Sequence, residues 1–370
     1  MVNHFLSTRE ENSCFGCSAC ANVCPAGTIK MQENEKGFLY PEIDIDKCVK
    51  CGKCEKACPW HIEMEGRKIS VLYAAKHKDE KVVNESQSGA VFTLVSDYIL
   101  ENGGVVYGAA FNKDLSVSHK RAVSKEERDL MRESKYVQSI ISSELIDNIH
   151  EDCQSGRLIL FTGTPCQVYM VNKNFGCYKN MYMLDFMCHG VPSPKVWKDY
   201  LEYRERKWGS FERARFRNKK DGDRGWHTES LFDVDGAEHI SNMYAAIFYS
   251  HLAHRECCYT CPFASEIRYS DLTMGDFNDR NLLKVKDKNN VSMLFVNTEK
   301  GKFLFSKVKK NAHIKRCQIQ YYKNQPCLYH PIKKEEATDD FWHEYREMPL
   351  DKLLKKYVAD EIIERYHLRF

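Results

Sequence analysis

Two runs of four cysteines near the start of the chain constrain its fold more than any other feature. The runs are Cys14-x-x-Cys17-x-x-Cys20-x-x-x-Cys24 and Cys48-x-x-Cys51-x-x-Cys54-x-x-x-Cys58, each followed by proline. A 4Fe–4S cube needs four thiolates from different directions, and in the bacterial two-cluster arrangement the fourth cysteine of each run ligates the other cluster. We therefore expect one cluster on Cys14, Cys17, Cys20 and Cys58, and a second on Cys48, Cys51, Cys54 and Cys24.

Other uses of these cysteines fit the pattern less well. Zinc also accepts four cysteines in C-x-x-C spacing, but zinc ribbons usually supply two well-separated pairs, without a third close cysteine or a trailing Cys-Pro. Disulfides are disfavoured because the first residues lack the apolar segment of a secretion signal, and reducing compartments keep thiols free. The pattern predicts a two-cluster ferredoxin-like domain over residues 1–68.

Composition bounds the class of protein. The 370 residues are 43% hydrophobic and carry a formal net charge of +3. This length allows more than one core, and the balanced charge gives no indication of a polyanionic partner. The sequence contains no run of about 18 apolar residues, the length that a membrane helix needs. We expect a cytoplasmic protein without a membrane span and without a nucleic-acid partner.

Apolar periodicity divides the rest of the chain into three parts. Residues 69–155 predict a small α/β domain, in which a helix from Val91 to Ile99 precedes a buried strand. In residues 156–330, about twenty residues separate two apolar strands, as a parallel βαβ crossover requires, so we expect a second α/β domain. Residues 331–370 predict a solvated helical tail. The predicted fold class is α+β, a ferredoxin-like head followed by a mixed α/β domain.

Four further cysteines could gather at one edge of the predicted sheet. Cys166 and Cys188 each follow a predicted parallel strand, and open sheets place their sites at the carboxyl ends of such strands. Cys258 and Cys261 form a C-x-x-C downstream, where Cys257 competes with Cys258 as a ligand. These thiols could hold a third cluster, although isolated cysteines are also common as small buried hydrophobic residues.

Five short segments together resemble one known family, the coenzyme F420 hydrogenase/dehydrogenase beta subunits. They are Ser134-Lys135-Tyr136-Val137-Gln138-Ser139, Gly163-Thr164-Pro165-Cys166-Gln167, Cys188-His189-Gly190-Val191-Pro192, Cys258-Tyr259-Thr260-Cys261-Pro262-Phe263 and Ser270-Asp271-Leu272-Thr273-Met274-Gly275-Asp276-Phe277. The resemblance covers roughly residues 70–320, and such relatives often carry an N-terminal two-cluster ferredoxin. It implies FAD and a third 4Fe–4S cluster on Cys166, Cys188, Cys258 and Cys261, because the C-x-x-C-P-F segment begins at Cys258.

Flavin contacts are predicted from turns and from the resemblance. The chain has no G-x-G-x-x-G fingerprint after a strand. Glycine-bearing turns bring backbone N–H groups close to an anion, although turns also need glycine for their own geometry. This makes candidates of Ser88, Gly89, Gly163 and Thr164. The resemblance adds Ser134, Lys135, Tyr136 and Ser139, and the sequence leaves the catalytic residues unassigned.

The expected function combines these cofactors. Iron–sulfur clusters carry one electron at a time, a hydride carrier moves two, and a flavin can exchange electrons singly or in pairs. We therefore expect an oxidoreductase that passes electrons between a ferredoxin-like redox partner protein and a low-potential small-molecule hydride donor or acceptor, with coenzyme F420 as a candidate. The alternatives are a non-catalytic electron-transfer subunit of a larger redox complex and a zinc-stabilised binding protein.

Overall fold

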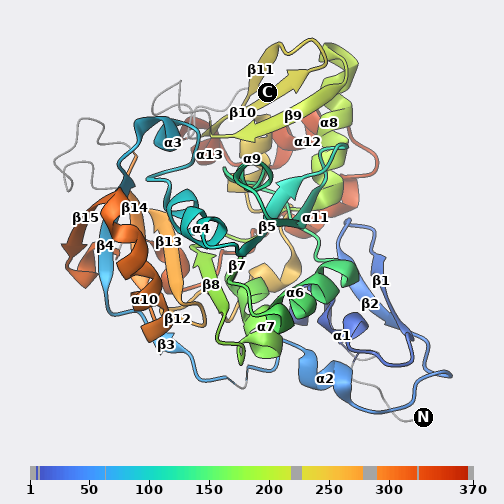
Figure 1. The fold of residues 1–370 in the computed structure, drawn as a ribbon. Helices are drawn as coiled ribbons and strands as arrows, with labels where there is room; N and C mark the ends of the chain where they lie inside the picture. The colour runs from blue at the N-terminus through green and yellow to red at the C-terminus, as the bar shows by residue number, and fades with distance from the viewer. Residues whose placement is uncertain are drawn as a thin grey trace.

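The head of the chain folds as a small lobe at one side of the molecule (Figure 1). The computed structural model describes residues 6, 9–62, 64–217, 227–277, 290–322 and 325–365. An antiparallel hairpin, β1–β2, forms the frame of the lobe, and two short helices lie within the cysteine runs. The elements of the head are η1 (Glu11–Ser13), α1 (Ala19–Asn22), β1 (Ile29–Glu33), β2 (Leu39–Ile43) and α2 (Lys53–Ala57).

A mixed eight-stranded sheet forms the centre of the body, in the order β15-β4-β14-β13-β8-β7-β5-β6. Its strands are β4 (Leu72–His77), β5 (Val105–Phe111), β6 (Val117–Ala122), β7 (Ile159–Gly163), β8 (Met181–Phe186), β13 (Leu272–Asp276), β14 (Ser292–Val296) and β15 (Ala312–Cys317). The inner strands β5, β7, β8 and β13 are parallel, so the predicted β7–β8 crossover is confirmed. The outer strands pair antiparallel.

Strands from residues 69–155 and from residues 156–330 interleave in this sheet. β4 lies between β15 and β14, and β5 pairs with β7. The domain boundary expected after residue 155 therefore falls inside one continuous sheet. Apolar periodicity shows that a segment is a strand, but it does not show which distant strand lies beside it.

Helices cover both faces of the sheet, as the alternation of its buried side chains requires. Val106, Leu160 and Leu184 share a core with α4 (Val91–Glu101) and α10 (Glu299–Val308). Their neighbours in the chain face the opposite side and pack on α6 (Ser143–Ser155) and α7 (Pro165–Phe175). Because these strands are buried on both faces, their sequences are continuous apolar runs.

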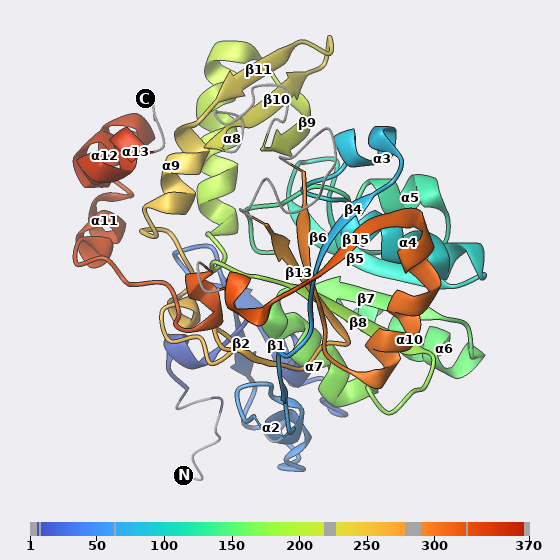
Figure 2. The same cartoon turned by 90° about the vertical axis from the view of Figure 1, so that its left-hand side faces the viewer.

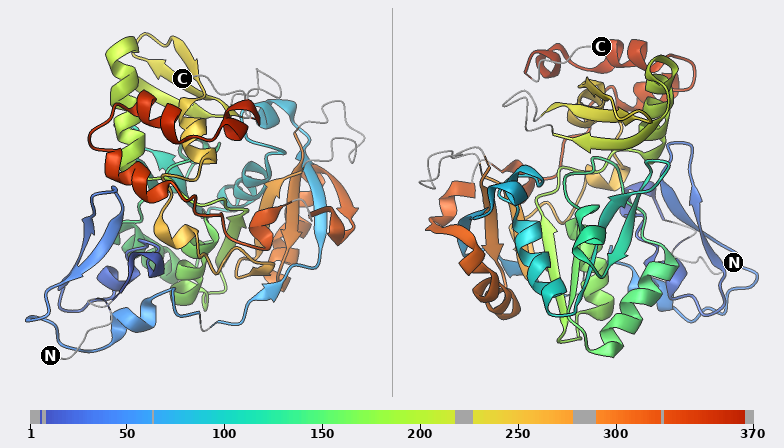
Figure 3. Two further views of the ribbon diagram at one scale, coloured as in Figure 1. Left: turned by 180° about the vertical axis from the view of Figure 1, so that it is seen from behind. Right: turned by 45° about the horizontal axis from the view of Figure 1, so that its top comes forward.

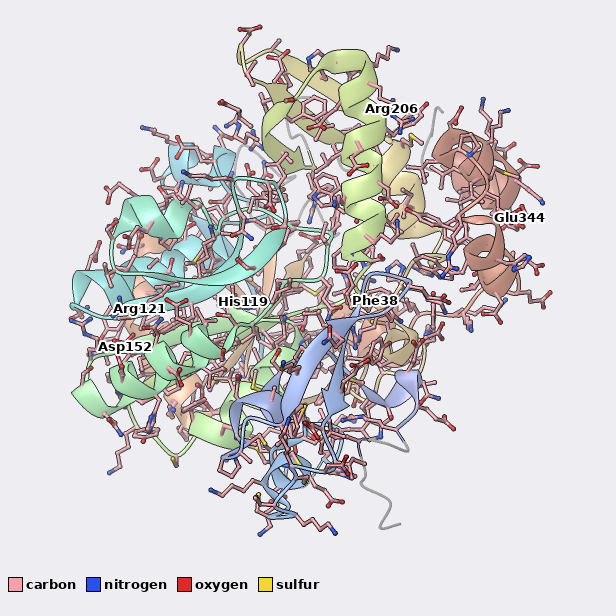
Figure 4. All side chains as sticks on the ribbon, turned by 90° about the vertical axis from the view of Figure 1, so that its right-hand side faces the viewer. Phe38, His119, Arg121, Asp152, Arg206 and Glu344 are labelled. Carbon is pink, nitrogen blue, oxygen red and sulfur yellow. The ribbon has the colours of Figure 1, made fainter. Side chains whose placement is uncertain are left out.

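A bidentate ion pair fixes α6 to the edge strand β6. The Arg121 Nε atom lies 2.8 Å from Asp152 Oδ2, and Nη2 lies 2.9 Å from Oδ1. Figure 4 shows the two side chains next to each other, with His119 further along the same strand. Arg121 and His119 both lie on β6, and His119 lines the cavity described below.

A second lobe stands over the carboxyl edge of the sheet (Figure 2). Its three-stranded sheet has the order β11-β10-β9. The elements of this lobe are α8 (Pro194–Trp208), β9 (Phe211–Phe216), β10 (Glu229–Asp233), β11 (Glu238–Ser241), α9 (Met243–Tyr249), α11 (Thr338–Glu344), α12 (Leu350–Tyr357) and α13 (Asp360–Arg365). The expectation of a solvated tail was wrong, because Phe341, Leu353 and Leu354 are buried in the core of this lobe.

Short elements connect these parts and dock the head. They are β3 (Arg67–Lys68), α3 (Glu80–Asn84), α5 (Lys125–Asp129), η3 (Glu256–Cys258), β12 (Ile267–Arg268), η4 (Lys309–Asn311), η5 (Ile319–Tyr322) and η6 (Pro326–Leu328). Lys36 in the head pairs with Glu256 of η3 at 3.1 Å, and Lys173 of α7 donates to the Cys58 carbonyl at 3.2 Å. Figure 3 shows the head against the body from behind. Every helix in the described ranges is too short or too polar to cross a membrane.

Candidate redox cofactor sites

Two small hollows in the head are lined by the two ligand sets expected from the sequence. Cys14, Cys17, Cys20 and Cys58 line the first, here called the proximal hollow. Cys24, Cys48, Cys51 and Cys54 line the second, the distal hollow. The last cysteine of each run thus stands with three cysteines of the other run, as in two-cluster ferredoxins. α1 and α2 produce this exchange, because each holds its third cysteine and delivers the fourth just beyond its last turn.

The backbone around the two runs has matching left-handed residues. Gly16 and Lys50, each two residues after the first cysteine of a run, have φ of 64° and 53°. Their N–H groups donate to the Sγ atoms of Cys14 and Cys48, both at 3.4 Å. A left-handed lysine is uncommon, and such backbone conformations cluster at functional sites. N–H donors directed at sulfur are one of the means by which a protein tunes a cluster.

A third hollow is lined by the other four expected cysteines. Cys166 begins α7, Cys188 follows β8, Cys258 ends η3, and Cys261 lies just beyond it. Three distant segments thus meet at the carboxyl edge of β7 and β8. Cys257 is absent from the residues lining this hollow and packs instead in an apolar cluster with Phe15, Tyr169 and Phe263.

Some of these buried thiols are hard to ionise without a positive centre beside them. Burial, together with the charges of Cys14 and Cys58, raises the pKa of Cys20 to about 12. Burial also raises the pKa of Cys166 to about 11. In the described part of the chain, no three Cys, His, Asp or Glu side chains converge as the ligands of a single metal ion would. A cube distributes its thiolates over separate irons around a central volume, which is how these side chains surround each hollow.

A larger cavity of about 260 Å³ lies next to the third hollow. It opens between the carboxyl edge of the sheet and the second lobe, from which α9 contributes Phe248. Seven of the eight expected flavin contacts line it, namely Ser88, Ser134, Lys135, Tyr136, Ser139, Gly163 and Thr164. Gly89 is not among the lining residues. A Cβ atom there would lie 2.1 Å from the Ala75 carbonyl oxygen, so the backbone packing on β4 requires glycine.

A chain of hydrogen bonds runs along the wall between the third hollow and the cavity. The Thr162 carbonyl can only accept, so His119 Nε2 donates to it at 3.0 Å and Nδ1 accepts from the Ser139 hydroxyl at 2.9 Å. Gln167 Nε2 donates to Ser139 Oγ at 3.0 Å. Thr164 Oγ1 lies 3.0 Å from Gln167 Oε1 and 3.1 Å from Cys166 Sγ. This series of hydrogen bonds therefore connects the cavity with Cys166, a proposed cluster ligand.

One part of this series of hydrogen bonds has a signal in the sequence, and another part has none. Thr164 and Gln167 form the capping box of α7, with the Thr164 N–H donating to Gln167 Oε1 at 3.1 Å, and the spacing of a cap residue and a glutamine three positions on could have indicated it. His119 had no such signal. Burial lowers its pKa to about 4, so its imidazole is neutral at neutral pH.

Charged side chains also line the cavity. Arg217, with φ of 64°, forms an ion pair with Asp276 at 3.0 Å. Beside them, the Tyr136 ring stacks on Phe248 with 4.3 Å between ring centroids. Burial lowers the pKa of Lys135 to about 8, and its Nζ donates to the Leu130 carbonyl at 3.2 Å. The cavity thus offers a fixed positive group, an aromatic face and several hydroxyls.

These sites define the class: an iron–sulfur electron-transfer protein. Residues 156–321 match the family model that describes the C terminus of the coenzyme F420 hydrogenase/dehydrogenase beta subunit. Residues 13–62 match a 4Fe–4S dicluster domain, and a second dicluster model matches residues 40–93. Residues 59–93 contain no cysteine, so the second match shares the second cysteine run. The chain carries the C-terminal domain of this family behind a dicluster head, which confirms the resemblance.

Individual relatives match parts of the chain. Coenzyme F420-dependent sulfite reductase of Methanocaldococcus jannaschii is 27% identical over 199 residues, 51% of this chain and 29% of that protein. The I subunit of NADH-quinone oxidoreductase from Pelobacter propionicus is 39% identical over 67 residues, 15% of this chain and 36% of that protein. The chain therefore spans about a third of the length of these relatives. A chain of the F420-reducing [NiFe] hydrogenase complex from Methanosarcina barkeri aligns with a TM-score of 0.49 and 17% identity, covering 82% of this chain and 94% of that chain.

Proposed function

We propose that the chain is an iron–sulfur flavoprotein oxidoreductase that passes electrons between a one-electron partner protein and a low-potential two-electron substrate through FAD. The proposed substrate is a hydride carrier, with coenzyme F420 as the first candidate, because the matching family model and the sulfite reductase relative both carry this coenzyme in their names. The proposed metal ligands are the twelve cysteines that line the three hollows.

The observation that carries the proposal is that neighbouring sites share walls. Phe15 lines both the proximal hollow and the third hollow. Thr164, Gln167, Cys188, Gly190 and Val191 line both the third hollow and the cavity. Distal and proximal hollows are joined by Cys20, Cys24 and Cys54, which pack in one cluster. The four sites therefore form a series, which is what a relay of electrons needs.

The cavity fits the chemistry of a flavin. Its volume of about 260 Å³ is close to the lower end of typical cofactor pockets, about 300 Å³. When bound, a flavin supplies the exchange between single electrons and hydride. The ring of Tyr136 offers a face for an aromatic group, and the hydroxyls of Ser134 and Ser139 offer polar contacts. Arg217, held by Asp276, places a positive charge where an anionic group could bind.

A non-catalytic electron-transfer subunit is the second candidate. One observation favours it: several relatives that match the head are named as subunits, among them the I subunit of NADH-quinone oxidoreductase and the B subunit of an ion-translocating oxidoreductase complex from Methanosarcina acetivorans. In this role the chain would pass electrons to a partner enzyme and bind no hydride carrier. Both candidates include a redox partner protein.

Anaerobic purification with iron, sulfide and flavin counted per chain tests the proposal. We expect about twelve irons, four for each of three cubes, and one FAD that an added hydride donor reduces. About eight irons would remove the third cluster, and clusters without flavin would support the electron-transfer alternative. Cys258→Ala should lower the iron count by about four, whereas the matched control Cys257→Ala should retain it. A colourless, iron-free protein would contradict the proposal.

A further inference from the structure

Arg255 is a buried cation at the seam between the head and the body. Its side chain is 1% exposed. Nε donates to the Cys14 carbonyl at 2.7 Å, and Nη2 donates to the Leu39 carbonyl at 2.8 Å. Nη1 donates to Gln138 Oε1 at 3.2 Å, and Gln138 Nε2 in turn donates to the Phe15 carbonyl at 2.9 Å. The guanidinium therefore binds the loop that contains Cys14, the first cysteine of the proximal set.

The head is shaped to accept this side chain. A Cβ atom on Gly16 would lie 2.8 Å from Arg255 Nη1, so the glycine between Cys14 and Cys17 leaves room for the guanidinium. The Tyr40 ring lies 4.2 Å from Arg255 Cζ, and the ring of Phe38, labelled in Figure 4, lies 5.3 Å away. These contacts are neutral, and they satisfy hydrogen bonds without cancelling the charge.

Arg255 differs from the other buried arginines in its partners. Arg128 pairs with Asp97, Arg217 with Asp276, and Arg268 with Asp185. Among the described residues, no carboxylate lies within ion-pair distance of Arg255, and the adjacent Glu256 pairs with Lys36 and Lys334 instead. A buried charge is costly unless an opposite charge compensates it. The surroundings of Arg255 must therefore supply negative charge from groups other than carboxylates.

Two hollows flank the guanidinium and could supply that charge. On the head side Arg255 holds the Cys14 carbonyl, and Cys14 lines the proximal hollow. On the body side Nη1 donates to Gln138 Oε1 at 3.2 Å, and Gln138 lines the third hollow. The Arg255 carbonyl also accepts from the N–H of Cys258, which lines the same hollow.

We propose that Arg255 is a positioning residue whose charge is balanced by the proximal and third clusters together, and that it raises the reduction potentials of both. The inference rests on the proposed function. A cube with four thiolates is anionic, and reduction adds one negative charge that a nearby cation stabilises. In the transfer, one electron leaves the proximal cluster and reduces the third cluster by one electron, and no proton or covalent bond changes. Because Arg255 contacts both ligand loops, it stabilises the electron on either side.

Redox titrations of the purified holoprotein followed by EPR test the proposal. Arg255→Gln removes the charge and keeps a hydrogen-bonding side chain. At a fixed potential we expect the ratio of reduced to oxidised cluster to fall about tenfold at both clusters, which equals about 59 mV for one electron. The distal cluster should change least. Cys258→Ala identifies the signal of the third cluster by its loss.

Two further variants separate charge from docking. Arg255→Lys keeps the charge but not the planar fork, and we expect both potentials to stay close to those of the wild type. Lys36→Gln removes the ion pair between the head and Glu256 without touching the buried charge, and it should leave both potentials unchanged. Equal shifts in Arg255→Lys and Arg255→Gln, or the same shift in Lys36→Gln, would overturn the proposal. If Arg255→Gln does not fold, lowered potentials in Arg255→Lys, which keeps the charge, would overturn the proposal.

The iron count separates this inference from the proposed function. About twelve irons in every Arg255 variant would show that three clusters are present, so unchanged potentials in Arg255→Gln would then contradict the role of Arg255 alone. About eight irons in the wild type would instead contradict the third cluster, and with it the proposed function.

Discussion

Thr164 has one hydroxyl proton and two neighbours that can accept it. Its Oγ1 lies 3.1 Å from Cys166 Sγ and 3.0 Å from Gln167 Oε1. A hydrogen bond to a ligand sulfur favours the reduced cluster. Thr164→Val keeps the shape of the side chain and removes the donor, so we predict a lower reduction potential for the proposed third cluster. The expected change is about 1 kcal/mol, or roughly fivefold in the ratio of reduced to oxidised cluster. An EPR-monitored redox titration measures this potential. In Thr164→Ser, which keeps the hydroxyl, the potential should stay near that of the wild type. Equal effects of valine and serine would contradict a role for the hydroxyl.

His119 makes stability depend on pH. Its pKa is lowered to about 4 by burial, so between pH 6.5 and pH 4 the unfolded chain binds a proton that the folded chain excludes. The contribution of the neutral His119 to the free energy of unfolding is fully present above pH 6.5 and is lost as pH falls toward 4. Between pH 7.5 and pH 5.5, we predict that the stability advantage of the wild type over His119→Gln narrows by about 1 kcal/mol. Urea unfolding at the two pH values measures this, and a constant difference would show that the histidine does not titrate in this way.

At the residue scale, the sequence predicted which thiols lie together, but not which other side chains surround them. Cluster ligation demands fixed spacings, so the cysteine runs predicted which thiols stand together. Arg217, Asp276, His119 and Arg255 come from separate segments, and only the tertiary structure brings them to the sites. Gly89 shows the opposite case, in which a glycine expected near the flavin is used for backbone packing.

At the scale of elements, the turn into α4 depends on Gly89. A Cβ atom there would lie 2.1 Å from the Ala75 carbonyl oxygen and 2.8 Å from the Ser292 nitrogen, backbone atoms that cannot rotate away. We predict that Gly89→Ala destabilises the fold by about 3 kcal/mol, measured by thermal unfolding. Gly236→Ala is the control, because its Cβ would meet open space and only its φ of 80° is unfavourable, at about 1 kcal/mol. Normal melting with loss of FAD would instead support a direct flavin contact.

Element types were largely predictable, whereas their arrangement was not. Pro194 and Ser193 mark the start of α8, and the apolar runs of β7 and β8 flank a helix of the length that a parallel crossover needs. The pairing of β4 with β14 and β15 joins segments more than two hundred residues apart, and no local pattern encodes such a contact. The helices α11 and α12 complete the core of the second lobe. Their apolar residues are visible in the sequence, but the sequence does not show which surface these residues cover.

At the scale of the whole molecule, the order of the sites determines which cofactors each electron donor can reduce. Because the third hollow shares walls with both the cavity and the proximal hollow, it is the junction between the head and the proposed flavin site. We predict that Cys258→Ala divides the protein into two redox halves. An added hydride donor should reduce the flavin but leave the head clusters oxidised, and a one-electron donor should reduce the head clusters but not the flavin. Stopped-flow absorbance with EPR of freeze-quenched samples measures both.

Cys24→Ala provides the matched control, because it removes a ligand of the distal hollow at the other end of the series. In this variant electrons from the hydride donor should still reach the third and proximal clusters, and only exchange with the one-electron partner protein should fail. Reduction of the head clusters through the flavin at the wild-type rate in Cys258→Ala would contradict the series. It would mean that electrons pass between the cavity and the head by a route that avoids the cysteines of the third hollow.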